Sequence, residues 1–316
     1  MNWPNVRQPL LITLWCLSCS GGTDPDDSPT PDDETSPTDT AASPTPEGAT
    51  PTPADVTQDE RDVEIQFKVM VGDEPFQCGT RYRDVGTTLS DFLPMDLRFF
   101  VHDVVLITDD QTEIPLPLLD DGAWQAYGVA LLDFEDGKGS CTNGTSAIHT
   151  SISGSVPVAN YTGLRFKVGV TEEVNQLDPA LSLPPFNSYT MYWSWATGYK
   201  FMKIEGKTGG YPSGWLFHLG SVGCTTQENG TIDTCANPNR AQVELDGFDP
   251  DTGVVVLDLA ELLSGSNLDT AGDNSPGCMS QTSDPDCVPL YDVLGLPMEA
   301  GDEMDPQRAF SVALEP

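Results

Sequence analysis

Short runs of alternating apolar and polar residues constrain the fold of this chain more than any other feature. Over residues 63–71 every second position is valine, isoleucine or phenylalanine, and this period of two predicts a strand with one buried face. Clusters of Gly, Pro, Asn and Asp separate further runs of this kind. They lie at residues 97–108, 124–134, 163–170, 189–205, 214–220, 241–247 and 253–259.

The windows with a helical pattern are few. A helix is expected after Asp258 through "LAELL", and a further helical turn within 172–184. Many strands with little helix indicate an antiparallel sandwich or barrel. We predict an all-β domain over residues 62–316, an antiparallel β-sandwich with Greek-key-like connections, held by disulfides and preceded by a disordered tether.

The N-terminus has the pattern of an export signal. Residues 10–18, "LLITLWCLS", are apolar but too short to span a bilayer. Cys19 follows in a context that resembles a bacterial lipobox, although Cys16 stands where leucine is usual. We predict a signal peptide at 1–18 and lipidation of Cys19, and Ser20 favours sorting to the outer membrane, facing the periplasm or the cell surface. The alternative is plain secretion with cleavage nearby.

Residues 19–61 form an acidic linker dominated by Pro, Thr, Ser and Asp. Such a composition cannot bury enough apolar surface to offset chain-ordering entropy, so the segment is expected to be an extended, disordered spacer. The whole chain has a formal net charge of -35, with 49 acidic against 14 basic residues. Nucleic acid is therefore excluded as a partner, because phosphate binding needs a basic footprint. A lipid anchor is the only membrane attachment expected.

The cysteines beyond the tether form an even set, which in an exported protein indicates disulfides. Asn229-Gly230 lies midway between Cys224 and Cys235, and Asn-Gly is the preferred hairpin turn. The two cysteines should therefore face each other across a ladder at a distance that a disulfide can bridge.

The other disulfides follow from position. Cys278 and Cys287 bracket a turn-rich loop and are expected to pair locally, which leaves Cys78 and Cys141 as a pair by elimination. A zinc site is the weaker alternative, because none of these six cysteines belongs to a C-x-x-C and no histidine stands at ligand spacing from any of them.

Histidine is scarce, and this narrows the chemistry. His149 lies in a polar stretch and is expected to be exposed, whereas His102 and His218 each interrupt an apolar strand. None of the three lies in a nucleophile-elbow context. A buried, neutral imidazole with a hydrogen-bond partner is the simplest interpretation of a histidine in such a strand. Two of them beside a W-x-W strand make a metal site a competing interpretation.

Three segments carry a family resemblance: "RFFVHDVVL", "MYWSWATGYKFMKIEG" and "GWLFHLGSVGC". Over residues 62–260 the chain resembles the MbnP-like copper-binding proteins, each encoded beside a di-haem enzyme of the cytochrome c peroxidase/MauG type. The resemblance implies that this partner oxidises Trp193, the first tryptophan of W-x-W, to kynurenine. It also implies one bound copper ion, expected as Cu(I), with His102 and His218 as ligands, and no enzymatic turnover by this chain.

The same resemblance makes four cysteines those of the family, and this chain adds two more and a longer acidic tether. The four are Cys78, Cys141, Cys224 and Cys235, and the additional ones are Cys278 and Cys287. The role implied is copper acquisition, storage or delivery outside the cytoplasm.

The oxidation has a chemical rationale. An intact indole nitrogen is only a donor, whereas opening the ring liberates an aryl amine that can bind metal. Copper suits imidazole nitrogen, and Cu(I) also accepts thioether sulfur. On a single strand Met191, Trp193 and Trp195 would share one face. Met191 is then a core residue or an extra ligand, and Trp195 an electron relay or a packing residue. Asp103 would point away from His102 and make a poor partner for it.

Two other classes of function stay open. The chain could be a structural or glycan-binding surface lipoprotein, in which case Trp193 and Trp195 would be exposed as a stacking platform and no metal would be retained. A hydrolase is the weakest alternative. Acid pairs such as Asp103 and Glu205 occur by chance in strands, and the chain has no nucleophile motif.

Overall fold

The computed structural model describes residues 59–316, except 195–196, 229, 231, 271–274, 300 and 315–316. The predicted signal peptide, Cys19 and nearly all of the tether lie outside the described residues, as do Trp195 and Asn229. Within the described part, no helix combines the length and hydropathy needed to cross a bilayer.

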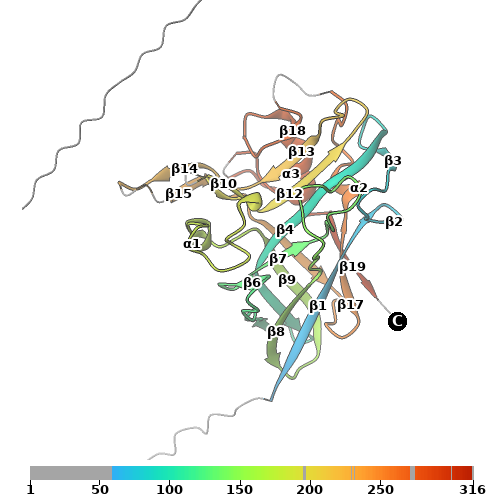
Figure 1. Cartoon of the computed structure of the whole chain (residues 1–316). Helices are drawn as coiled ribbons and strands as arrows, with labels where there is room; N and C mark the ends of the chain where they lie inside the picture. Colours follow the sequence, from blue (N-terminus) through green and yellow to red (C-terminus); the bar gives the residue numbers. More distant parts are fainter. Residues whose placement is uncertain are drawn as a thin grey trace, which may run out of the picture. The chain divides into compact units, whose positions relative to one another are not determined.

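Two large β-sheets make up most of the described domain (Figure 1). The smaller sheet has the order β19-β17-β1-β2, with β8 also paired to β1. Its strands are β1 (Glu60–Val71), β2 (Glu74–Pro75), β8 (Ser151–Pro157), β17 (Gly253–Asp258) and β19 (Phe310–Leu314).

The larger sheet has the order β16-β9-β4-β12-β13-β18, with β3, β5 and β7 also paired to β4 and β6 paired to β7. Its strands are β3 (Tyr82–Val85), β4 (Ser90–Thr108), β5 (Glu113–Pro115), β6 (Gln125–Ala126), β7 (Val129–Asp133), β9 (Tyr161–Val168), β12 (Met202–Lys207), β13 (Trp215–Leu219), β16 (Ala241–Asp246) and β18 (Gly277–Cys278).

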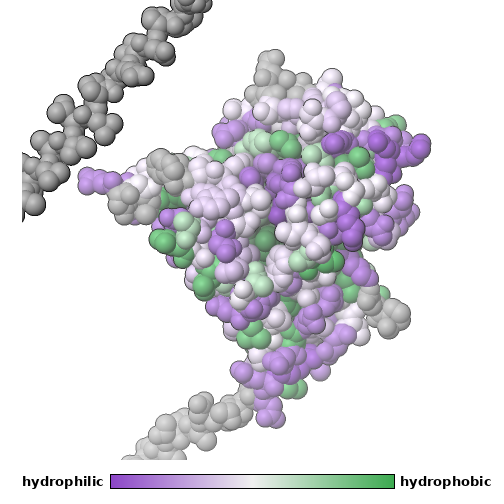
Figure 2. All heavy atoms as spheres, viewed as in Figure 1, coloured by the Kyte–Doolittle hydropathy of each residue, from purple (hydrophilic) through white to green (hydrophobic). Residues whose placement is uncertain are grey.

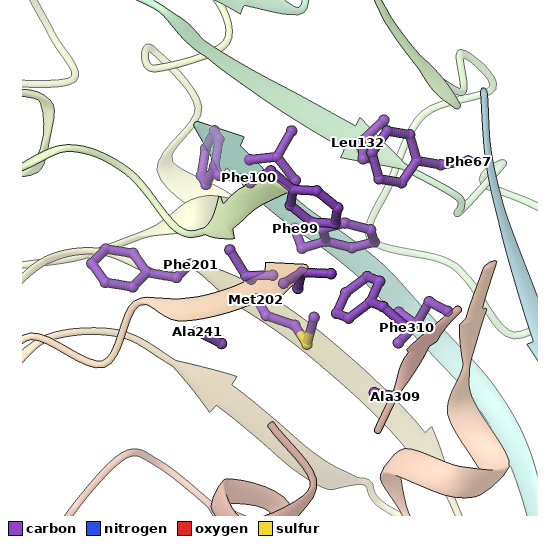
Figure 3. Close-up of a cluster of buried hydrophobic side chains, with 14 of the residues drawn as sticks. Phe67, Phe99, Phe100, Leu132, Phe201, Met202, Ala241, Ala309 and Phe310 are labelled. Carbon is purple, nitrogen blue, oxygen red and sulfur yellow. The ribbon is translucent and has the colours of Figure 1, made fainter. Parts of the chain in front are cut away.

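The core lies between the two sheets, where their apolar faces meet. Phe67 of β1 contacts Phe99 and Phe166 of the larger sheet edge-on, at ring-centroid distances of 6.3 and 5.6 Å. Phe310 of β19 contacts the same two rings at 5.8 and 5.6 Å. Figure 3 shows Phe67, Phe99 and Phe310 in this cluster together with Met202. The β-sandwich prediction is thus confirmed, and edge-to-face geometry suits the ring quadrupoles.

Helices are short and lie between strands. The predicted helix after Asp258 is present as α2 (Leu259–Leu262), because the Asp258 side chain accepts hydrogen bonds from the Ala260 and Glu261 amides. The predicted helical turn within 172–184 is α1 (Glu172–Asn175). The other helical elements are η1 (Tyr189–Met191), η2 (Pro285–Cys287) and α3 (Val288–Leu294).

Two features of the sheets differ from the prediction. The pairs β1–β17 and β13–β18 are parallel, so the sandwich is not purely antiparallel. Alternation reports which face a strand buries and says nothing of its direction, so the sequence could not reveal this. Strand β8 was missed, because Gly154 occupies an inward position where a Cβ would lie 2.5 Å from the Leu116 side chain.

All three predicted disulfides are present: Cys78–Cys141, Cys224–Cys235 and Cys278–Cys287. Cys224 and Cys235 are opposed in the hairpin of β14 (Val222–Thr226) and β15 (Ile232–Asn237), which projects from the body of the domain (Figure 1). Three disulfides indicate an oxidising compartment, and hydrophilic side chains cover much of the surface seen in Figure 2.

Candidate metal centre

A small hairpin positions Trp193. Strand β10 (Tyr192–Ser194) pairs with β11 (Gly198–Tyr199), so the single strand predicted over 189–205 is wrong. The chain turns back because Gly198 adopts a positive φ of 76°, and a Cβ there would lie 2.2 Å from the Asn175 side chain. Only glycine fits this position. Met191 ends η1 and does not share a strand with Trp193.

Trp193 packs against β13 and the residue that follows it. Its ring lies edge-on to that of His218, with centroids 6.1 Å apart. A Cβ on Gly220 would lie only 2.8 Å from the Trp193 Cζ3 atom, so the indole occupies the space that glycine leaves free. Trp193 is half-buried and lines a pocket of about 400 Å³ with Ser194, Thr197, Val222, Met279 and Gln281.

His218 is buried on β13 with one nitrogen bonded and one free. Its Nε2 lies 2.8 Å from the Glu205 Oε1 atom, and its Nδ1 is buried without a hydrogen-bond partner among the residues that the structure describes. Only 6% of the residue is exposed. A buried polar atom left without a partner is costly, so it marks a position where a ligand would be accepted.

Burial and the contact between the two side chains determine the charges of His218 and Glu205. Burial lowers the pKa of His218 below its ordinary value, although Glu205 acts in the opposite direction. The imidazole is thus neutral near pH 7, the form that binds metal. Burial alone would raise the pKa of Glu205, but the hydrogen bond with His218 and the charge of Lys203 hold it at about 2. The carboxylate therefore stays ionised.

A buried row of charges continues from Glu205 into the sheet. Lys203 lies 3.2 Å from Glu205 and 2.5 Å from Asp96, and Arg98 binds the same Asp96 with its Nε at 2.8 Å from Oδ1. The sequence interpretation did not predict this network. The pattern that could have indicated it is a pair of apolar strands that each carry two opposite charges at the same spacing, "DLR" on β4 and "KIE" on β12.

His102 lies on β4 beside a β-bulge. The ladder with β9 shifts register after His102, and Asp103 takes a positive φ of 51°. This bends the backbone, so Asp103 Oδ1 lies 3.2 Å from His102 Nδ1, and the prediction that Asp103 points away is wrong. The contact does not have hydrogen-bond geometry, so within the described part of the chain both ring nitrogens of His102 are buried without a hydrogen-bond partner. Burial lowers the pKa of His102.

His102 and His218 lie on the same face of the larger sheet but at different places. His218 is opposite Lys203, which is opposite Arg98, four residues before His102. Two strand spacings and four residue rises correspond to about 16 Å between their Cα atoms. The buried pair Phe100 and Phe201 occupies the intervening positions. No hydrogen bond, ion pair or ring contact within the described residues joins His102 to Trp193 or His218.

The remaining predicted residues have other roles. His149 was expected to be exposed, but it is half-buried: its ring stacks on Trp124 at 5.2 Å, and its Nδ1 lies 2.7 Å from the Leu131 carbonyl oxygen. An isolated antiparallel β-bridge pairs the backbone of His149 with that of Asp133. Met191 is fully buried in the hydrophobic core, in agreement with its interpretation as a core residue.

One group of three ligand-type side chains lies close together in the described part of the chain: Cys78, Glu135 and Cys141. Both sulfur atoms form a disulfide, so they are not thiolates. Both Glu135 oxygens accept backbone hydrogen bonds, from Gly137 and Thr145. These contacts account for the cluster as loop structure. His218, whose ring contacts that of Trp193 and whose Nδ1 has no hydrogen-bond partner among the described residues, is therefore the stronger candidate.

Comparison with known proteins identifies the family. The family model MbnP matches residues 60–280. The chain belongs to the MbnP family. A solved structure, MbnP from Methylosinus trichosporium, is 28% identical and aligns over 81% of this chain and 99% of that chain, with a TM-score of 0.72. A search among curated proteins finds no match. The resemblance that the sequence motifs indicated is thus confirmed.

The region that matches the MbnP family model contains all the strands that form the candidate site. The matched residues 60–280 include β4, the β10–β11 hairpin, β12 and β13. The W-x-W-x-x-G-Y motif coincides with the hairpin that carries Trp193, and the motif around His218 coincides with the strand against which it packs. Each motif therefore corresponds to a structural element of the candidate site.

Proposed function

We propose that this MbnP-family protein binds one copper ion at a site that is completed by oxidation of Trp193 to kynurenine. The observation that carries the proposal is the contact between the Trp193 ring and His218, whose Nδ1 is buried without a hydrogen-bond partner. Imidazole nitrogen is a ligand that suits copper, and the aryl amine of kynurenine would add a second nitrogen ligand.

Oxidation would convert a packing residue into a ligand. Cleavage of the indole C2–C3 bond adds two oxygen atoms, and hydrolysis then releases C2 as formate, so the residue loses one carbon and gains one oxygen. The product carries a free aryl amine in place of the ring nitrogen. A di-haem enzyme of the cytochrome c peroxidase/MauG type would supply the oxidising equivalents. The half-buried indole borders an open pocket, which leaves it accessible from one side.

His218 and residue 193 form the core of the proposed site. His102 was the other predicted imidazole ligand, but its Cα lies about 16 Å from that of His218, which is too far for both rings to bind one ion in this arrangement of the sheet, so the proposed site does not include it. The packing of Trp193 against Gly220 and His218 argues against the alternative of a stacking platform for glycans, which needs an exposed face.

Histidine substitutions test the ligand set. Copper content should be measured by metal analysis on protein isolated from its native host after dialysis. His218→Ala should lose copper, whereas His102→Ala should retain it, because that ring does not reach the ion bound by His218. His149→Ala is the matched control, because this histidine is half-buried and already bonded to a carbonyl, and it should retain copper. Loss of copper in His149→Ala, or its retention in His218→Ala, would overturn the assignment.

We further propose that lipidation at Cys19 anchors the protein outside the cytoplasm, by its tether, for copper acquisition, storage or delivery. The support is the apolar run that ends in Leu-Ser-Cys and the acidic segment that follows. A Cys19→Ala variant should move from the membrane fraction to the soluble fraction. A variant that stays membrane-bound would remove the anchor from the proposal.

A further inference from the structure

The bond between His218 and Glu205 determines which imidazole nitrogen is available. An ionised carboxylate has no proton to donate, so in the 2.8 Å contact the His218 Nε2 must be the donor. A neutral imidazole carries one proton only. With that proton on Nε2, the lone pair of Nδ1 is available to a metal, and Nδ1 is the ring atom for which the described residues supply no hydrogen-bond partner.

Ion pairs with neighbouring buried side chains hold Glu205 in place. Lys203 lies 3.2 Å from Glu205 and 2.5 Å from Asp96, so it bridges two carboxylates on neighbouring strands. Asp96 in turn accepts two hydrogen bonds from Arg98. Side-chain exposure in this group is at most 10%. A rotation of Glu205 away from His218 would therefore separate buried charges, which is costly.

The strands place this row by register. Glu205 is opposite Asp96, and Lys203 is opposite Arg98 in the β12–β4 ladder, while His218 is opposite Lys203 in the β12–β13 ladder. All five side chains therefore project from one face of the larger sheet. Positive and negative groups alternate along each strand, whereas like charges lie opposite each other across the β12–β4 ladder. The Lys203–Asp96 and His218–Glu205 contacts therefore run diagonally between strands, and the histidine lies at the end of the row.

We propose that Glu205, backed by Lys203 and Asp96, is a positioning residue that holds His218 in the Nε2-protonated tautomer and presents Nδ1 as the metal-binding atom. This inference rests on the proposed copper site. Metal-binding histidines commonly donate their second ring N–H to a carboxylate, and loss of that partner typically lowers metal affinity about 10–100-fold.

The tautomer is measurable without copper. Uniformly ¹⁵N-labelled, copper-free protein should show the His218 ring with the proton on Nε2, by the pattern of ring nitrogen–proton couplings. In Glu205→Gln the amide can donate as well as accept, so His218 should populate both tautomers, and the affinity for Cu(I) should fall about 10-fold. Glu244→Gln, an exposed carboxylate on β16, is the control and should change neither quantity.

The outcomes separate the two proposals. A wild-type His218 protonated on Nδ1, or a Glu205→Gln variant with unchanged tautomer and affinity, overturns the positioning role. The wild-type spectrum decides the point even if Glu205→Gln folds poorly. His218→Ala tests the copper site itself. If that variant keeps wild-type Cu(I) affinity while the wild-type tautomer is as expected, the proposed function fails and the positioning of the ring by Glu205 stands.

Discussion

Substitution of Gly220 by alanine should displace Trp193 from His218. The added Cβ would lie 2.8 Å from Trp193 Cζ3, 2.9 Å from the Tyr199 carbonyl oxygen and 3.2 Å from Trp193 Cε3. The first distance is about 0.7 Å short of the ~3.5 Å optimum for two carbon atoms. The carbonyl belongs to the β10–β11 hairpin and has little freedom to yield. The methyl group must therefore push the indole or the hairpin outward.

The expected cost is that of overpacking a well-packed position, about 1–3 kcal/mol in the free energy of unfolding. Unmodified recombinant protein is the right material, because residue 193 is then an intact tryptophan. Urea unfolding gives the free energy, and the chemical shift of the His218 ring reports the loss of the neighbouring indole. Gly209→Ala is a matched control, because the atom nearest to its new Cβ is Asp269 Oδ1 at 3.6 Å.

In the control, both the stability and the His218 shift should remain near those of the wild type. If Gly220→Ala unfolds at the wild-type urea concentration with an unchanged His218 shift, the indole does not pack against Gly220. The contact that carries the proposed function would then be absent.

Two further predictions concern stability. Removal of the Cys78–Cys141 disulfide, which spans 63 residues, should lower the free energy of unfolding by about 4 kcal/mol according to the loop-entropy relation. Removal of Cys224–Cys235, which spans 11 residues, should lower it by about 3 kcal/mol. Chemical denaturation of paired Cys→Ser variants tests this order, and the reverse order would contradict it. Burial raises the pKa of Asp133 to about 7, so the folded state takes up a proton and stability falls as the pH rises from about 4 to 7. Asp133→Asn should therefore be more stable than the wild type at pH 8, by up to about 4 kcal/mol, and the difference should vanish near pH 4; an equal difference at both pH values would refute the burial argument.

The sequence predicted the strands well where one face is buried and the other is solvated. The run that became β1 alternates between buried and exposed side chains along most of its length, so its pattern was clear. The 19-residue strand β4 is buried on both faces over its middle, and only part of it was predicted. The break between β10 and β12 was missed, because it depends on Gly198 fitting against Asn175, a contact distant in sequence.

The candidate site was predictable in its residue types and not in its geometry. The motifs identified Trp193 and His218, and the structure places them in contact. The role of Glu205 was not visible, because the bond to His218 depends on strand register across a ladder. The Asp103 bulge shows the same limit, since a simple alternation rule placed that side chain on the wrong side of the strand.

Intact-mass and peptide analysis of protein from the native host, combined with its copper content, is the strongest test of the proposed copper site. The peptide with residue 193 should have lost one carbon and gained one oxygen, Trp195 should be unmodified, and one copper ion should be bound. A Trp193→Phe variant should fold and yet retain less copper. An unmodified Trp193 in copper-loaded native protein, or wild-type copper retention by Trp193→Phe, would contradict the account.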